Sequence, residues 1–178
     1  KEVENILVGR PSEIDTTVDF PKERGLGKSI LFNLFLSNYA FSQCASNGNN
    51  TNDEYIGRVQ LQAIDNTSGV GTTSTGYSDF TAISTDLTQN SNYTITVTPI
   101  WTGPIYSEGY AVWIDYNQDN DFTDPGELVF SNVPSTTSPV SGSFTVPATA
   151  LTGNTTMRVS MKFDDIPTSC EVFTYGEV

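Results

Sequence analysis

Tyr93–Thr98 (YTITVT) is the stretch that decides the fold class, because apolar side chains alternate strictly with threonines. Tyr93, Ile95 and Val97 would share one face of a strand, and the threonines would share the other face. Such alternation is typical of a β-strand with one buried and one solvated face. The stretch therefore predicts a half-buried antiparallel sheet rather than a helix.

Residues 142–146 and 157–163 alternate in the same way, and other apolar stretches are further strand candidates, separated by clusters of Gly, Pro, Asn and Asp. Together these stretches are residues 55–61, 111–114, 128–130, 142–146, 157–163 and 171–175. About seven to nine antiparallel strands in a chain of this length favour two packed sheets. The sequence thus predicts an all-β, antiparallel two-sheet β-sandwich of jelly-roll type, formed by residues 43–178.

The composition is acidic and contains no histidine. The 178 residues include 21 acidic and 8 basic side chains, a formal net charge of -13. This balance argues against nucleic acid or an anionic membrane as a partner, because both are bound through basic patches. The absence of His excludes Ser-His-Asp and Cys-His catalysis and every zinc site that contains His. Carboxylate chemistry, binding of a hard cation, or no chemistry at all remain.

Residues 28–42 have the features of a secretory signal peptide. A basic residue precedes an apolar stretch, 30–36, and the small residues Ala40 and Ser42 follow at the spacing that signal peptidase requires. The apolar stretch is too short to span a bilayer as a helix; a buried amphipathic helix is the alternative. On the signal-peptide interpretation, residues 1–27 are a leader, and the mature domain is exported to the cell surface or secreted without inserting into the membrane.

The most informative motif is an acidic loop between two expected strands, residues 115–127 (DYNQDNDFTDPGE). Calcium takes six to eight oxygen ligands, and a tight loop with an oxygen at every second residue can turn them inward. Asn120 stands where an EF-hand has Gly, and Asn tolerates the left-handed turn. A solvated turn is the alternative, but its crowded carboxylates would repel one another. We therefore predict a Ca²⁺ site with the ligands Asp115, Asn117, Asp119, Asp121, Asp124 and Glu127.

A second group of acidic residues could form another cluster. It comprises Glu54, Asp164, Asp165, Glu171 and Glu177. Two carboxylates about 5–10 Å apart on either side of a sugar could hydrolyse a glycosidic bond. A carboxylate-dependent hydrolase is nevertheless the least favoured function, because a second cation site or plain surface acidity explains the same residues.

Cys44 and Cys170 lie at opposite ends of the expected domain. After export, such a pair can oxidise to a disulfide that staples the first and last strands. Two buried free thiols are the alternative.

Trp101 and Tyr106 could form an exposed platform that stacks on sugars. Trp101 follows Pro99 and Ile100 in an expected loop, where the indole ring could equally be exposed or buried. An exposed, coplanar pair of rings would favour carbohydrate binding.

Many stretches, in this order along the chain, resemble the GEVED domain, a module of secreted and surface proteins of Bacteroidetes. They are residues 44–48, 54–56, 66–69, 76–81, 93–97, 112–117, 121–122, 126–129, 157–161, 170–171 and 175–178. The resemblance covers about residue 44 to the end. The signature of the family continues with Glu-Asp and a final strand, so we expect a domain truncated at its C-terminus.

The resemblance implies a β-sandwich accessory module without established catalytic residues, often next to peptidase or adhesive domains and exported by type IX secretion. Its acidic stretch matches residues 115–122, except that Asn120 replaces the usual Gly. We therefore expect a non-catalytic, calcium-binding interaction module of a secreted or surface bacterial protein. Its partners would be other domains of a larger protein, or a surface protein or glycan. A carbohydrate-binding module of a glycan-degrading protein is the alternative.

Overall fold

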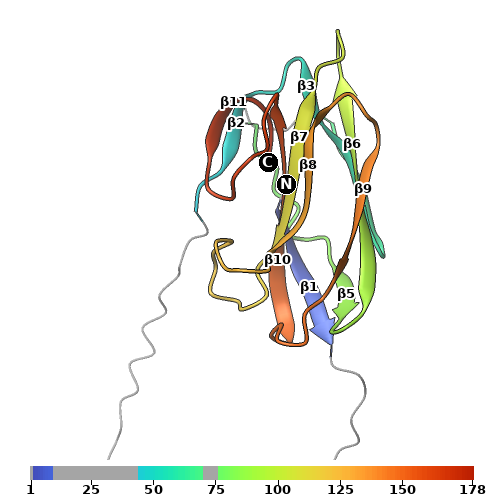
Figure 1. Cartoon of the computed structure of the whole chain (residues 1–178), viewed down its shortest axis with the longest axis vertical. Coiled ribbons are helices and arrows are strands. Elements are labelled where there is room, and N and C mark those ends of the chain that lie inside the picture. The colour runs from blue at the N-terminus through green and yellow to red at the C-terminus, as the bar shows by residue number, and fades with distance from the viewer. Residues whose placement is uncertain (1, 10–43, 70–75) are drawn as a thin grey trace, which may run out of the picture.

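A computed structural model describes residues 2–9, 44–69 and 76–178. These ranges form eleven strands arranged in two sheets (Figure 1). Within them, no helix has the length and apolarity needed to cross a membrane. The predicted signal-peptide segment, 28–42, lies outside the described residues.

The smaller sheet has four antiparallel strands, and β6 lies at its centre with the alternation that the sequence predicted. Its order is β4 (Ile64–Thr67), β3 (Glu54–Leu61), β6 (Asn92–Trp101) and β9 (Val140–Thr145). Ile95 and Val97 are fully buried. On the other face, Thr94 and Thr96 make hydroxyl hydrogen bonds to serines of β9 at 3.0 and 2.8 Å.

The larger sheet is built around β10 (Gly153–Phe163), the longest strand. Its other members are β2 (Asn47–Asn50), β11 (Val172–Glu177), β1 (Glu2–Gly9), β5 (Thr85–Thr88), β7 (Glu108–Ile114) and β8 (Leu128–Ser135). One edge of β10 pairs with β7, which in turn pairs with β8. The opposite edge of β10 pairs with two strands, β11 near its end and β1 near its start.

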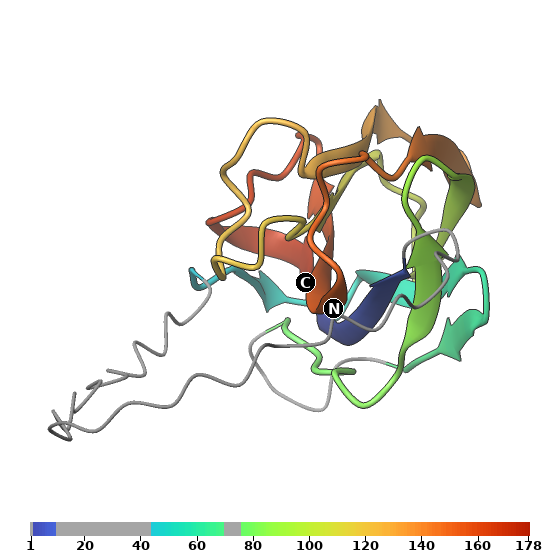
Figure 2. The same cartoon turned by 90° about the horizontal axis from the view of Figure 1, so that it is seen from below.

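The hydrophobic core lies between the two sheets, which face each other in Figure 2. Alternate residues of each strand point into it, as the pleat of a sheet requires. Fully buried members include Ile56, Ile95, Val112, Met157 and Val159. The all-β sandwich prediction is confirmed, although the parallel pairs β1–β5 and β2–β11 interrupt the antiparallel pattern.

The disulfide prediction is also confirmed. Cys44 and Cys170 are bonded, with their Cα atoms 5.3 Å apart. The residues that follow the two cysteines enter the parallel strands β2 and β11. The bond therefore staples the first strand after residue 43 to the last strand of the chain.

Eleven strands exceed the expected seven to nine, because four strands escaped the sequence analysis. Three of them, β2, β4 and β5, have only four residues each, so each face carries only two side chains and no alternation can be recognised. The fourth, β1, lies in the segment 1–27 that was interpreted as a leader. The sandwich of the structure thus includes Glu2–Gly9, which a domain boundary at residue 43 leaves out.

Candidate metal centre

The acidic loop connects β7 to β8 and is held at its base by backbone hydrogen bonds. The N–H of Ile114 donates to the carbonyl of Glu127 at 2.9 Å, which closes the loop. The N–H of Asp115 donates to the carbonyl of Thr156 on β10 at 3.1 Å. In Figure 1 the loop, drawn in gold, projects beside β10. Its first and last residues are therefore fixed by the sheet.

Phe122 anchors the middle of the loop to the outer face of the larger sheet. Its side chain is 2% exposed and packs with Ala111 and Trp113 of β7. The guanidinium of buried Arg158 lies 4.7 Å from the centre of the Phe122 ring, a cation–π contact. Arg158 also donates to the carbonyl of Ser169 at 2.5 Å. The loop is therefore attached to the sheet at three points.

Between these anchors, left-handed residues and side-chain hydrogen bonds curl the loop. Asn120 has a φ of 69°, so the predicted left-handed turn at this position is confirmed. Three side-chain oxygens each accept the N–H two residues later: Asn117 from Asp119 (3.1 Å), Asp119 from Asp121 (3.1 Å) and Asp121 from Thr123 (2.7 Å). Such side-chain hydrogen bonds to the backbone two residues later are Asx turns, which bend the chain tightly.

Three carboxylates converge within the curled loop. Asp119, Asp121 and Asp124 each offer an oxygen, and these atoms lie within 4.8 Å of one another. The amide of Asn117 donates to Asp119 at 2.8 Å and to Asp124 at 2.7 Å. The side-chain amide of Asn117 thus lies between two of the acids.

Two further carboxylates lie buried at the base of the loop. Asp115 and Glu127 are 2% and 3% exposed. One oxygen of each accepts a backbone N–H, from Asn120 at 3.1 Å and from Tyr116 at 3.0 Å. The other oxygen of each, Oδ1 of Asp115 and Oε2 of Glu127, is buried without a hydrogen-bond partner. The polypeptide alone therefore leaves two acceptor atoms unsatisfied.

Burial raises the pKa of both carboxyls. The pKa of Glu127 rises to about 7, first because the group is desolvated and then because Asp115 is near. Desolvation likewise raises the pKa of Asp115, and the charge of Asp119 adds to the effect. Negative charge is therefore costly at the base of the loop unless a positive group compensates it.

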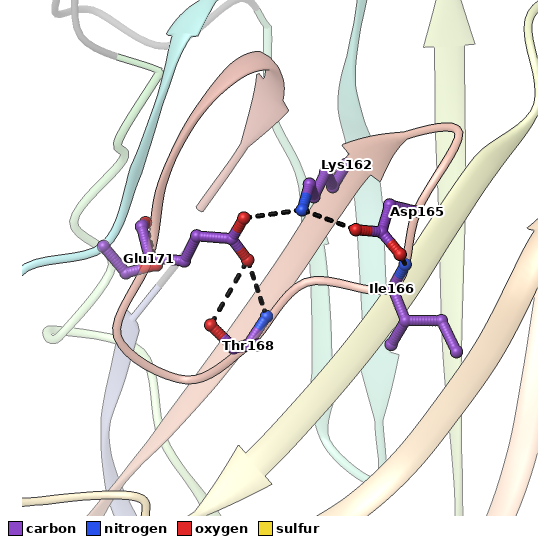
Figure 3. A network of polar contacts seen from close by, with 6 residues as sticks. Lys162, Asp165, Ile166, Thr168 and Glu171 are labelled. Carbon is purple, nitrogen blue, oxygen red and sulfur yellow. Dashed lines mark hydrogen bonds and ion pairs between the residues drawn. The ribbon is translucent and has the colours of Figure 1, made fainter.

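The second acidic group is divided among different environments. Lys162 binds both Asp165 (2.9 Å) and Glu171 (2.5 Å) in a network at the end of β10 (Figure 3). Thr168 donates to the second oxygen of Glu171 through its N–H (3.0 Å) and hydroxyl (3.2 Å). The hydrogen bond from Lys162 lowers the pKa of Asp165. These two carboxylates are occupied by a protein cation and stabilise a turn.

Glu177 is fully buried and has a structural role. Its two oxygens accept the N–H of Ile56 at 2.8 Å and the hydroxyl of Ser78 at 2.7 Å. These bonds connect β11 to β3 of the opposite sheet. Asp164, by contrast, is exposed on the turn after β10, where its φ is 53°.

Glu54 is buried beside an acid that the sequence analysis missed, Glu108. Glu108 is fully buried at the start of β7, and neither carboxylate oxygen has a hydrogen-bond partner. Desolvation and then the charge of Glu54 raise the pKa of Glu108 to about 8. The side chain of Trp101 opposes part of this rise, because its interaction with Glu108 lowers the pKa. The alternation of Glu108, Tyr110 and Val112 along β7 was the signal that could have placed Glu108 inside the sandwich.

The two expected sugar-stacking residues differ in their surroundings. Trp101 is half-buried, and its ring N–H lies in the interior. Tyr106 packs edge-on against Phe163 at 5.7 Å, and Phe163 packs edge-on against Tyr175 at 6.1 Å. These three rings, with Asp53 and Glu54, line a pocket of about 230 Å³. The aromatic side chains that meet are therefore Tyr106, Phe163 and Tyr175.

Residues 109–178 match the family model of the GEVED domain. The resemblance to the GEVED domain is therefore confirmed for residues 109–178. The match begins in β7 and covers the acidic loop, β8 to β11 and Cys170; the resemblance noted for residues 44–108 lies outside it. No curated protein and no solved structure matches the chain significantly.

All six predicted cation ligands lie within the GEVED match. Oxygens of Asp119, Asp121 and Asp124 lie within 4.8 Å of one another, whereas Asp115 and Glu127 are buried and are not part of this group. Phe122 and Arg158, which fix the acidic loop to the sheet, also lie in the match but were not singled out from the sequence. The Tyr-Gly-Glu-Val stretch of the GEVED domain supplies Glu177, which joins the two sheets.

Proposed function

We propose that this chain is a non-catalytic, calcium-binding accessory module of a secreted or cell-surface bacterial protein. The observation that carries the proposal is the pair of buried, unpartnered oxygens of Asp115 and Glu127 beneath three converging carboxylates. Five acids in one loop would repel one another. A cation with oxygen ligands would satisfy the buried atoms and cancel the repulsion.

Calcium fits this donor set better than other common cations. All six predicted ligands offer carboxylate or amide oxygens, and neither Cys nor His is among them. Calcium accepts six to eight such ligands in flexible geometry, whereas Mg²⁺ keeps several waters and uses few protein ligands. The curled loop, with Asn120 and Gly126 at positive φ, is compatible with a ligand shell of this size.

Thermal unfolding with calcium and with EGTA tests the proposal. Calcium at a hundred times its Kd should stabilise the folded chain by about 2.7 kcal/mol and raise the Tm by several degrees. Asp119→Asn with Asp121→Asn should abolish most of this gain, because two ligand charges are removed while the turn-forming oxygens stay. Asp86→Asn, on an exposed position of β5, is the matched control and should keep the full gain. A Tm that is the same in calcium and in EGTA contradicts the proposal.

Export is part of the same proposal and rests on different observations. The disulfide Cys44–Cys170 is typical of oxidising compartments, and residues 28–42 carry the signal-peptide pattern. Fusing residues 28–42 to a leaderless reporter enzyme that is active only after export should give activity. Replacing Ala40 and Ser42 by bulky residues should block cleavage, and a fusion that stays inside the cell would contradict this part.

Carbohydrate binding is the second candidate. The pocket of Tyr106, Phe163 and Tyr175 supports it, although these rings meet edge-on and do not form the coplanar pair that the sequence led us to expect. Phe163 and Tyr175 are 39% and 41% exposed, next to the carboxylates of Asp53 and Glu54. Exposed rings beside hydrogen-bonding groups are suited to a sugar ring. A glycan array should then give binding that Tyr175→Ala removes. Binding that survives this substitution would place the glycan elsewhere, and an array without any signal would favour the accessory role alone.

A further inference from the structure

β11 and β1 lie end to end on the same edge of β10. Glu177 of β11 pairs with Met161, and Glu2 of β1 pairs with Arg158, three residues earlier on β10. Both strands run antiparallel to β10. In Figures 1 and 2 the start of β1 lies beside the end of β11. The two segments therefore share one register, as the halves of one strand would, although they come from opposite ends of the sequence.

β1 fills a position that the rest of the sheet leaves open. It pairs antiparallel with β10 on one side and parallel with β5 on the other. Ile6, Leu7 and Val8 are paired on both sides. Among the described strands, β5 has β1 as its only neighbour in the sheet. Without β1, two strand edges would face each other across the width of one strand, with unpaired N–H and C=O groups on both.

The covalent connection does not determine which copy of the segment occupies this position. β1 is joined to β2 through residues 10–43, a stretch of 34 residues. A stretch of this length can span up to roughly 110–120 Å, several times the radius of gyration of about 14 Å expected for a domain of this size. A segment from a neighbouring copy can therefore reach the same position.

We propose that Glu2–Gly9 is an exchangeable donor strand. The groove between β10 and β5 is its acceptor site, and the partner of this groove is the Glu2–Gly9 segment of a second copy of the chain. Backbone hydrogen bonds to both edges supply the affinity, as in other cases of strand addition to an open sheet. Exchange of this segment links copies without altering the rest of the sandwich. This inference is independent of calcium binding. It applies to the uncleaved chain, because cleavage after Ser42 would separate Glu2–Gly9 from the rest of the sandwich.

Disulfide trapping between two copies tests the proposal. Glu4 is paired with Thr156, which is half-buried. Directly opposed residues of antiparallel strands have Cα atoms about 4.5–5.5 Å apart, which a disulfide can bridge. A full chain with Glu4→Cys and a differently tagged full chain with Thr156→Cys are mixed at high concentration and oxidised. A bond between residues 4 and 156 can then form only between copies.

We expect a heterodimer on non-reducing gels, with the 4–156 linkage identified by mass spectrometry. Its yield should exceed that of a control mixture by about tenfold, the ratio that 1.4 kcal/mol of specific pairing produces. In the control, Thr94→Cys, exposed on the other sheet, replaces Thr156→Cys. Adding Ile6→Pro to the donor copy should remove the excess, because proline cannot pair in a central strand. This variant cannot harm the folding of the acceptor copy, which is a separate chain.

The doubly substituted chain, with Glu4→Cys and Thr156→Cys, supplies the second measurement. At low concentration it should form the same bond within one chain, which shows that the groove binds this segment. Absence of that bond overturns the proposal. So does a mixture of single variants that yields no more heterodimer than the Thr94→Cys control, or a yield that Ile6→Pro leaves unchanged.

Discussion

Replacing Glu108 by Gln should remove a pH dependence that this buried acid imposes on folding. The carboxyl group is fully buried, and neither oxygen has a hydrogen-bond partner. Burial and the neighbouring charge of Glu54 raise the pKa from 4.5 to about 8. The penalty falls on the charged form, because the interior solvates a carboxylate poorly.

The sign of the effect follows from which state holds the proton. Between the unfolded pKa of 4.5 and the folded pKa of about 8, the folded chain keeps a proton that the unfolded chain has lost. The stabilisation is therefore complete below the lower value and is lost as the pH rises through the higher one. At 1.36 kcal/mol per pKa unit, this difference amounts to at most about 5 kcal/mol. Gln is neutral at every pH and nearly the same size.

Urea unfolding in EGTA, at about pH 5 and about pH 9, measures this contribution. At the lower pH, Glu108→Gln and the unsubstituted chain should have similar free energies of unfolding. At the higher pH the variant should be more stable, by up to about 5 kcal/mol. Glu54→Gln should move the pH transition of the unsubstituted chain downward, since one cause of the raised pKa is removed. A difference between the two chains that is the same at both pH values would refute the reasoning.

Three other predictions concern the covalent bond, one glycine and the loop anchor. Substituting both Cys44 and Cys170 by Ser should lower the free energy of unfolding by about 4–5 kcal/mol at most, measured by urea unfolding, because the bond closes a loop of more than a hundred residues. Gly176→Ala should lower the Tm, since the residue has a φ of 116° and a new Cβ would lie 2.1 Å from a backbone oxygen; Gly103→Ala, in open space, should not. Phe122→Ala should cost about 3–5 kcal/mol of stability and weaken calcium binding in calorimetry; unchanged binding would mean that the loop does not need its anchor.

The sequence predicted most clearly the strands that have local periodicity. β3, β6 and β10 each present several apolar side chains on one face, so the alternation is visible without knowledge of the partners. β1 could not be found in this way, because its residues show no alternation and its partners lie about 80 and 150 positions away. A pairing over such distances is decided by the whole sheet.

In the candidate site, too, local features could be predicted from the sequence and features that depend on the whole sheet could not. The spacing of oxygens in residues 115–127 is a local property, and three of the six ligands predicted from it, Asp119, Asp121 and Asp124, have oxygens that converge. Burial is not local: only the sheet places Asp115 and Glu127 inside, and only the turn after β10 brings Lys162 to Asp165 and Glu171. The sequence therefore predicted the acidic loop but could not separate acids that are free to bind a cation from acids paired within the protein.

The position of the disulfide has a mechanical consequence. Cys44 and Cys170 precede the paired strands β2 and β11 and are 126 positions apart. If the chain is stretched by its flanking segments, the tension passes through the sulfur–sulfur bond instead of through the strands between the two cysteines. The acidic loop lies within that shielded part, so such tension would leave it folded. Only β11 and the segment before Cys44 would carry the load.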